Sequence, residues 1–278
     1  MNKYIIASRP KTLIAAIMPL CISSSFFYTN HQADLKSVTL ITLMLLSSLG
    51  IQIATNYYND AYDDLNGFDE KRIGPARMSA TKQLSGKDLI RIANIILVFS
   101  FLVALPLAYI GGFYFSLLGL LSLYLAYGYS AGFLPLAQNG LGEIFTFLFF
   151  GLFAVNGSFY ILSNSIDSSL FWISIQYSFF ITLIITMNNL RDIETDQESG
   201  KKTLATKIGY QRYTQLIYFM TALPFILIMK VSNLTLLIDL PLYLFFCYLI
   251  HSKKIQKAFT ISCIGLVVVS ISIILDFV

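Results

Sequence analysis

Charged side chains are scarce in this sequence, since Asp, Glu, Lys and Arg together make up 12% of its 278 residues. An average soluble domain carries about twice that share. Hydrophobic residues account for 56% and aromatic residues for 15%, and the mean hydropathy is +0.70. This composition excludes an ordinary soluble globular protein. We therefore expect an integral membrane protein that contacts membrane lipid and binds no nucleic acid.

Cysteine and histidine are also rare. The three cysteines, Cys21, Cys247 and Cys263, lie inside apolar segments, where a free thiol behaves as a small hydrophobic group. The two histidines, His31 and His251, are far apart in the chain and show no metal-ligand spacing. These patterns argue against a disulfide framework and against a metal site built from thiolates or imidazoles.

What the chain has instead is a succession of long apolar segments. A helix needs about 20 apolar residues to cross a bilayer, and helices satisfy their own backbone hydrogen bonds there. We expect nine such spans, at residues 13–29, 38–58, 90–110, 113–133, 142–162, 170–190, 213–230, 234–250 and 258–275. The expected fold is an all-α bundle of nine transmembrane helices around a central cavity, formed by a single domain at 1–278.

The basic residues are distributed unevenly between the loops that connect these spans. Seventeen of the 19 Lys and Arg residues lie on the same side of the membrane as the N-terminus, whereas only Lys36 and Lys230 lie on the other. Cytoplasmic loops of membrane proteins are enriched in basic residues. The pattern therefore predicts a cytoplasmic N-terminus and a C-terminus on the opposite side.

The acidic residues are concentrated in two clusters. Ten of the 15 lie in the loops at 59–89 and 191–212, within or beside the segments NYYNDAYDDLNGFDEKRIGPAR (56–77) and NNLRDIETDQESGKKT (188–203). Four expected crossings separate the two loops, and an even number of crossings returns the chain to the same face. We therefore expect both clusters on the cytoplasmic face, where they can be neighbours.

Both clusters repeat one spacing of Asn and Asp. Residues at i, i+4 and i+8 share a helix face; this spacing occurs at Asn188, Asp192 and Asp196 and, 132 residues earlier, at Asn56, Asp60 and Asp64. Asn59 and Asp63 form a parallel pair. Carboxylates stacked in this way repel each other unless a positive charge lies against them. Ordinary solvated loops are also charged, but the repeated spacing favours a binding site.

The residue types of these clusters indicate the ligand. Oxygen ligands without His or Cys favour Mg²⁺, which binds one or two carboxylates and completes its coordination with water and phosphate oxygens. Neighbouring cations would meet the remaining phosphate charge: Arg72, Arg77, Arg191, Lys201 and Lys202. A phosphate site at the foot of an uncharged helical bundle fits a substrate with a diphosphate head and a hydrocarbon tail. A polyprenyl diphosphate has this structure, and aromatic faces stabilise the carbocation that it forms.

The same segments resemble a known family. NDAYDDLNG (59–67) resembles the first aspartate motif of the UbiA superfamily of intramembrane aromatic prenyltransferases, and RDIETD (191–196) with GKKTLATKIG (200–209) resembles the second. SRPKT (8–12), KRIGPAR (71–77) and NGLGE (139–143) are similar to the branch that prenylates 1,4-dihydroxy-2-naphthoate in menaquinone synthesis. Many superfamily members carry a further Asp four residues after Asp63, where this chain has Gly67. That departure is typical of the naphthoate branch and leaves the third ligand of the first motif open.

The resemblance implies a mechanism and a set of site residues. Mg²⁺ would be bound by Asn59, Asp60, Asp63, Asp192 and Asp196, of which the four aspartates are expected to be essential for catalysis. The diphosphate of a polyprenyl diphosphate would leave, and the ring carbon that bears the carboxylate would attack the allylic cation with loss of CO₂, giving demethylmenaquinone. The implied location is the bacterial cytoplasmic membrane, with the active site facing the cytoplasm.

Further residues are candidates for contacts with the substrates. Arg9, Lys11, Arg72 and Arg77 are candidates for binding the diphosphate or a carboxylate, with lipid contact or a topological role as the alternative. Asn188 is expected to assist the second motif. Glu143 is expected either to orient the aromatic substrate or to serve as a helix N-terminal acid. Tyr129 is a candidate for contact with the ring or the cation.

Three other functions are compatible with parts of the pattern. A 4-hydroxybenzoate prenyltransferase of the same superfamily is the nearest, and the KRIGPAR segment argues against it. A cation transporter would place ionisable residues within its spans, where this chain has almost none. A soluble isoprenyl diphosphate synthase also uses two aspartate-rich motifs, but its chain would be less hydrophobic.

Overall fold

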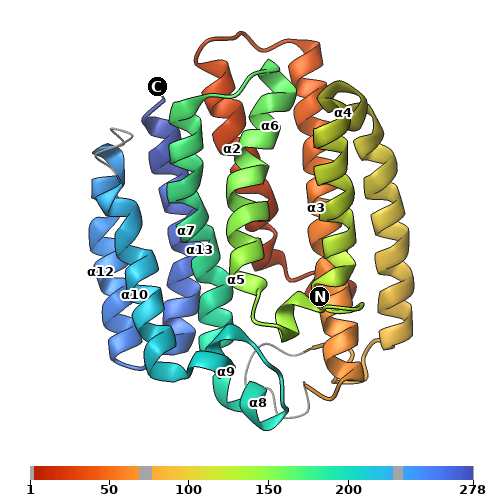
Figure 1. Ribbon diagram of the computed structural model, residues 1–278, viewed down its shortest axis with the longest axis vertical. Coiled ribbons are helices and arrows are strands. Elements are labelled where there is room, and N and C mark those ends of the chain that lie inside the picture. Colours follow the sequence, from red (N-terminus) through yellow and green to blue (C-terminus); the bar gives the residue numbers. More distant parts are fainter. Residues whose placement is uncertain (1–2, 69–76, 228–233, 278) are drawn as a thin grey trace.

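The computed structural model describes residues 3–68, 77–227 and 234–277, and every regular element in these ranges is helical. The all-α class expected from the sequence is therefore confirmed for this part of the chain. The long helices run side by side in an elongated bundle (Figure 1). They are α2 (Ile14–Tyr28), α3 (Leu35–Leu65), α4 (Gly86–Gly128), α7 (Ser168–Arg191), α10 (Tyr210–Ile226) and α13 (Ile255–Leu275).

Within the described ranges, six helical segments are long and apolar enough to cross a membrane: Pro10–Tyr28, Leu35–Leu65, Gly86–Gly128, Gly142–Ser163, Ser168–Arg191 and Ile255–Leu275. The expected span 90–110 falls within α4, and the span expected at 113–133 lies in α4 as far as Gly128, where the helix ends. The span expected at 213–230 overlaps the 17-residue α10, and that at 234–250 corresponds to the shorter apolar segment Thr235–His251. Nine crossings and a cytoplasmic N-terminus therefore stay predictions.

A single glycine divides α4. Gly112 has φ 72° and ψ −166°, outside the helical region, and L-residues rarely adopt such a positive φ. The two arms of α4 lie beside each other at the right of Figure 1. The first arm packs closely on α3, because a Cβ added to Gly50 would collide with the Ser100 side chain. Small residues allow such close helix approach in membranes.

The segment Gly142–Ser163 is a continuous helix in three parts, two α-helical and one π-helical. It comprises α5 (Gly142–Phe145), the π-helical η3 (Thr146–Phe153) and α6 (Ala154–Ser163). Gly151 of η3 lies directly against α7, because an added Cβ would collide with Ser178. π-Helical turns are frequent at functional sites, and η3 contributes to the walls of both cavities described below.

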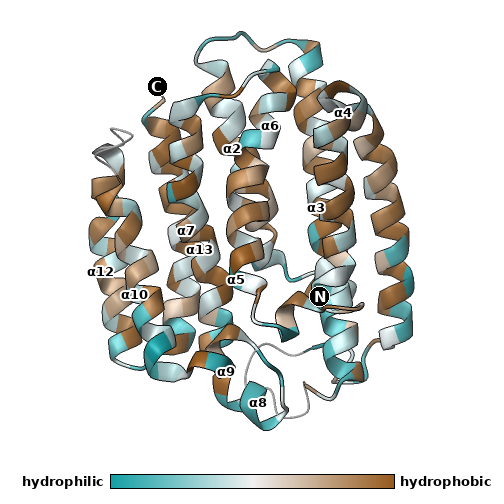
Figure 2. Cartoon of the chain, in the orientation of Figure 1, coloured by the Kyte–Doolittle hydropathy of each residue, from teal (hydrophilic) through white to brown (hydrophobic). Residues whose placement is uncertain are grey.

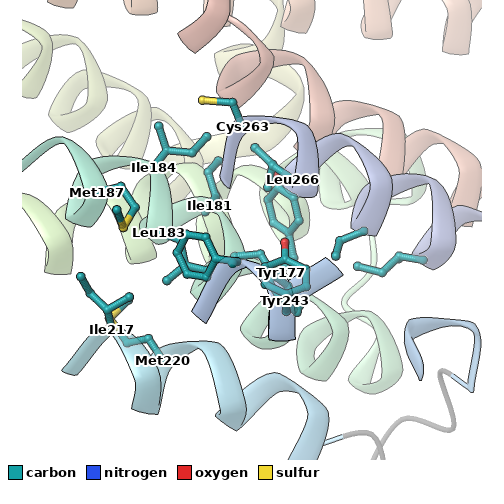
Figure 3. Packing of buried hydrophobic residues seen from close by; sticks show 14 of the residues in the cluster. Tyr177, Ile181, Leu183, Ile184, Met187, Ile217, Met220, Tyr243, Cys263 and Leu266 are labelled. Carbon is teal, nitrogen blue, oxygen red and sulfur yellow. The ribbon is translucent and has the colours of Figure 1, made fainter. Parts of the chain in front are cut away.

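The largest hydrophobic core surrounds α7. Tyr177 and Ile181 of α7 pack with Ile217 of α10, Tyr243 of α12 (Leu240–His251) and Leu266 of α13, all at most 2% exposed (Figure 3). Helix association in lipid gains little from the hydrophobic effect and depends on van der Waals packing. Cys263 belongs to this core, as expected for a small apolar group, and all three cysteines are free.

Polar residues gather at one end of the bundle. Figure 2 shows hydrophobic surfaces along most of its length and hydrophilic residues around the end where α8 (Ile193–Glu198) and α9 (Leu204–Ile208) lie. The last turns of α3 and the N-terminal helix α1 (Lys3–Ala7) lie at this end too. The bundle thus places both acidic clusters at the same end.

Candidate active site

Two adjacent cavities occupy the bundle. The polar cavity has a volume of about 460 Å³ and lies at the end of the bundle that carries the acidic clusters. The apolar cavity, of about 240 Å³, is lined by residues of α2, α3, α4, η3 and α6. Both are lined by Ala15, Thr55, Tyr129, Thr146 and Phe150. The two cavities therefore share a boundary, with ionic groups on one side and hydrocarbon on the other.

The wall of the polar cavity contains most of the residues predicted to form the site. Its charged members are Arg9, Lys11, Asp60, Arg77, Arg191, Asp192, Asp196 and Lys201, and four asparagines accompany them: Asn56, Asn59, Asn188 and Asn189. Both acidic clusters contribute to this wall. The expectation that they are spatial neighbours agrees with the structure, whereas the roles of the individual residues stay predictions.

The first cluster is held in place by the loop that follows it. Asp60 is only 1% exposed, and its carboxylate accepts hydrogen bonds from the backbone N–H of Met78 at 3.1 Å and from Ser79 Oγ at 2.6 Å. These bonds fix residues 78 and 79 against the end of α3. They also place Arg77, the one residue of the KRIGPAR segment within the described ranges, beside the cluster.

Two arginines converge on Asn59. Its Oδ1 accepts hydrogen bonds from Arg9 Nη2 at 2.7 Å and from Arg77 Nη1 at 2.8 Å. The backbone of Arg9 has φ 51°, a left-handed conformation that is uncommon for a residue with a side chain and costs about 1 kcal/mol or more. The surrounding contacts therefore hold Arg9 in place against a backbone preference.

Asp63 lies behind the wall rather than on it. Its Oδ2 accepts hydrogen bonds from Arg77 Nη2 at 3.1 Å and from Lys201 Nζ at 2.9 Å. Because Lys201 belongs to the second cluster, this ion pair joins the two acidic segments directly. Two cations against one buried carboxylate leave positive charge at the cavity wall.

The second cluster departs from the predicted continuous helix. Helix α7 ends at Arg191, and Asp192, with φ −92° and ψ 6°, caps the next short helix. A backbone hydrogen bond from the N–H of Asp196 to the Asp192 carbonyl, 2.8 Å long, retains the helical spacing across this break. Asn188, Asp192 and Asp196 accordingly all line the polar cavity, as the i, i+4, i+8 pattern predicts.

Arg191 donates two hydrogen bonds to the carboxylate of Asp192. Its Nε lies 2.6 Å from Asp192 Oδ1, and its Nη2 lies 2.7 Å from Asp192 Oδ2 and also from Asn188 Oδ1. Nη1 of Arg191 is buried and has no acceptor among the described residues. A guanidinium with one buried donor to spare beside a cavity is suited to an anionic ligand.

Glu143 is buried next to the cavity. It lies at the start of α5 and is 5% exposed; its Oε1 accepts hydrogen bonds from Asn189 Nδ2 at 2.8 Å and from Tyr213 OH at 2.5 Å. Asn189 lines the polar cavity, so Glu143 is linked to the cavity wall through its hydrogen bond with Asn189. Tyr129 lines both cavities.

One predicted residue within the described ranges lies away from the cavity walls. Lys202 is exposed and does not belong to either cavity wall, although its neighbour Lys201 does. Arg72 lies outside the described residues. The sequence spacing also grouped Asp64 with Asp60, but Asp64 is absent from both walls.

Gln52 and Asn189 are among the polar wall residues that the sequence interpretation missed. Gln52 lies one turn before Asn56 on α3, so a polar residue inside an otherwise apolar span was the available signal. Asn189 follows Asn188 directly, but it does not belong to the i, i+4, i+8 series that the sequence analysis used to select residues. The partner of Asn189, Glu143, comes from a distant part of the chain.

The donor set of this cavity suits Mg²⁺. Its candidate ligands are carboxylate and amide oxygens, which hard divalent cations prefer. Within the described ranges, no three His, Cys, Asp or Glu residues form a ready metal cage. Mg²⁺ commonly uses one or two carboxylates and takes its other ligands from water and substrate phosphates. The residues therefore fit an ion that is bound together with a phosphorylated ligand.

Comparison with known proteins agrees with this geometry. A sequence model of the UbiA prenyltransferase family matches residues 16–261. A protein of Haemophilus influenzae named 1,4-dihydroxy-2-naphthoate octaprenyltransferase is 34% identical over 209 residues, covering 73% of this chain and 68% of that protein. The Bacillus subtilis protein of the same name is 31% identical over 205 residues, covering 73% of this chain and 65% of its own length.

Solved structures share the fold at low sequence identity. A UbiA homolog from Archaeoglobus fulgidus bound to GPP and Mg²⁺ has a TM-score of 0.67 at 20% identity and covers 98% of this chain and 99% of that one. The apo structure of a UbiA homolog from Aeropyrum pernix K1 has a TM-score of 0.71 at 16% identity, covering 96% and 98%. With the family match extending over most of the sequence, the chain belongs to the UbiA prenyltransferase family.

Proposed function

We propose that this protein transfers a polyprenyl group from polyprenyl diphosphate to 1,4-dihydroxy-2-naphthoate, as the names of its relatives indicate for them. The observation that carries the proposal is the shared boundary of the two cavities. A polyprenyl diphosphate has one strongly anionic end and one hydrocarbon end. The polar cavity suits the anionic end and the apolar cavity suits the hydrocarbon end. The bond between the prenyl chain and the diphosphate, which must break, would then lie at the junction of the two cavities.

The polar cavity would bind the diphosphate. Arg9, Lys11, Arg77, Arg191 and Lys201 provide positive charge at its wall, and the spare Nη1 of Arg191 provides a buried donor. Mg²⁺ would be held by Asn59, Asp60, Asp192 and Asp196 at the wall, and the fifth predicted ligand, Asp63, would join them only by exchanging its contacts with Arg77 and Lys201. When bound, the ion neutralises negative charge on the departing diphosphate, which makes it a better leaving group.

The apolar cavity would bind the hydrocarbon. None of its described wall residues is charged, and its aromatic members include Phe145, Phe149 and Phe153, one helical turn apart. Aromatic faces stabilise a nearby cation by about 1–2 kcal/mol each when desolvated. The described wall also carries no carboxylate or amine that could capture an allylic cation; its polar side chains are hydroxyls of Ser, Thr and Tyr.

The proposed reaction balances without an additional base. The bond between C1 of the prenyl chain and the diphosphate oxygen breaks, and the diphosphate keeps the electron pair. The ring carbon that carries the carboxylate forms a bond to C1, and the carbon–carboxylate bond then breaks to release CO₂ and restore the aromatic ring. The product is a prenylated dihydroxynaphthalene, the reduced form of a demethylmenaquinone.

We infer from the positive-inside pattern that this chemistry takes place at the cytoplasmic face. The bacterial source of the two relatives favours a bacterial cytoplasmic membrane. A 4-hydroxybenzoate prenyltransferase would use the same cavity pair. The names of the relatives favour the naphthoate. A cation transporter is disfavoured because the described wall of the apolar cavity carries no ionisable side chain other than Tyr129 at its boundary.

The test uses the purified full-length protein in lipid. A labelled polyprenyl diphosphate is offered with 1,4-dihydroxy-2-naphthoate or with 4-hydroxybenzoate, with Mg²⁺ or with EDTA. We expect metal-dependent product and CO₂ release from the naphthoate alone. Product from hydroxybenzoate alone would replace the acceptor assignment, and turnover that persists in EDTA would refute the role of the metal.

A further inference from the structure

Gln52 extends the polar stripe of α3 toward the middle of the bundle. It precedes Asn56 by four residues and Asp60 by eight, so the three side chains share one helix face. At a rise of about 1.5 Å per residue, Gln52 lies about 12 Å along the helix axis from Asp60. Gln52 lines the polar cavity, while its neighbour Ile51 lines the apolar cavity. It is therefore the part of the stripe nearest the junction.

The amide of Gln52 is buried without a full set of hydrogen bonds. The residue is 7% exposed, and its Oε1 accepts no hydrogen bond from the described part of the chain. Asn56, on the same face, instead donates to the Ser8 carbonyl at 2.8 Å and to Thr12 Oγ1 at 3.2 Å. A buried polar atom without a partner is destabilising, so this oxygen is suited to a ligand donor.

The substrate chemistry decides which ligand supplies that donor. The diphosphate presents only acceptor oxygens, which the amide oxygen would repel, and its cationic partners lie nearer the charged end of the cavity. The prenyl tail has no polar atom. Only the aromatic acceptor carries hydroxyl groups. A primary amide offers an acceptor and a donor side by side, which complements a ring hydroxyl next to a carboxylate.

We propose that Gln52 binds the aromatic acceptor, with Oε1 accepting a hydrogen bond from a ring hydroxyl and Nε2 donating to the adjacent carboxylate. This inference rests on the proposed function and adds a specificity residue to it. An acceptor held here lies between the diphosphate groups and the apolar cavity. Its ring is thereby held beside the junction, where C1 of the prenyl chain would lie.

The Gln52→Met variant tests this assignment, because it keeps the length of the side chain and removes both polar atoms. We expect the dissociation constant of 1,4-dihydroxy-2-naphthoate, measured by calorimetry without prenyl donor, to rise about 10- to 100-fold, as the loss of both hydrogen bonds predicts. The KM for polyprenyl diphosphate should stay within about twofold. The melting temperature should not fall, since no hydrogen bond to Oε1 within the described chain is lost.

A second buried glutamine provides the matched control. Gln176 of α7 is 0% exposed, and its Nε2 donates to the Pro224 carbonyl at 3.1 Å; it does not belong to the described wall of either cavity. Gln176→Met should lower the melting temperature and leave naphthoate binding unchanged. The two variants thus separate ligand recognition from structural support.

An acceptor analogue completes the design. 2-Naphthoate lacks the ring hydroxyls and keeps only the carboxylate that Nε2 would bind, so Gln52→Met should weaken its binding by a smaller factor than that of dihydroxynaphthoate. Unchanged dihydroxynaphthoate binding in Gln52→Met, or an equal loss for 2-naphthoate, would overturn the assignment of Gln52 while leaving the proposed function intact. Failure of the wild type to bind or turn over the naphthoate would overturn both.

Discussion

Lys201 Nζ lies 2.9 Å from Asp63 Oδ2, across 138 residues of sequence. Both side chains are nearly buried, at 10% and 1% exposure, and the contact joins the end of α3 to the loop after α8. A buried, hydrogen-bonded pair of this kind loses most when one partner is removed, because the other charge is left unpaired. The site is therefore one unit built from two distant segments.

Replacing Lys201 and its neighbour Lys202 in separate variants distinguishes the specific contact of Lys201 from the effect of any positive charge in this segment. Lys201→Met should lower kcat/KM by about 10- to 100-fold, since a hydrogen bond to a charged group contributes about 1.5–3 kcal/mol. Lys202→Met removes the same charge from the adjacent exposed position and should leave kcat/KM within about twofold. Steady-state assays with polyprenyl diphosphate as the varied substrate measure both. Equal losses in the two variants would contradict a specific role for Lys201.

Two aspartates at opposite ends of α7 should behave differently. Asp192→Ala removes a predicted metal ligand and the partner of Arg191, and should lower turnover at least about 100-fold while the protein still inserts and stays folded. Asp167 caps the other end of α7 by accepting from the Leu170 N–H at 2.9 Å. Asp167→Ala should cost about 1 kcal/mol of stability and spare activity. Turnover assays and thermal unfolding distinguish them; an active Asp192→Ala protein would remove the argument for the second cluster.

The turn within α4 depends on one glycine. Gly112→Ala meets no steric obstacle within 4 Å, but the positive φ should cost about 1–2 kcal/mol and lower the melting temperature. Gly119 is also unobstructed and lies in a helical stretch of the second arm, so Gly119→Ala should stabilise by up to about 1 kcal/mol. Thermal unfolding in detergent compares the two. A Gly112→Ala protein as stable as the wild type would show that the turn does not require a left-handed residue.

The predicted orientation can be measured with single cysteines. In a background in which Cys21, Cys247 and Cys263 are replaced, Gln83→Cys and Asn30→Cys introduce exposed thiols in loops at opposite ends of the bundle (Figure 1). A membrane-impermeant maleimide should label Asn30→Cys in intact spheroplasts and Gln83→Cys only in inverted vesicles. The reverse pattern would place the site outside and contradict the orientation inferred from the basic residues.

Local sequence was sufficient for much of this structure. Long apolar segments specify membrane helices because each helix satisfies its own backbone hydrogen bonds without help from distant residues. The repeat of Asn and Asp every fourth residue likewise fixes a shared helix face, and it selected Asn188, Asp192 and Asp196, all of which line one cavity. Composition alone excluded a soluble protein.

Tertiary packing decided what local patterns leave open. Lys201 and Lys202 are adjacent residues of the same type, yet the path of the chain after α8 brings Lys201 to Asp63 and leaves Lys202 exposed. Asp63 lies behind the wall because Arg77 and Lys201 surround it, and Gln52 emerges as a wall residue only once the cavities exist. The physical reason is that burial and hydrogen bonding are properties of neighbours in space, and those neighbours come from helices far apart in the sequence.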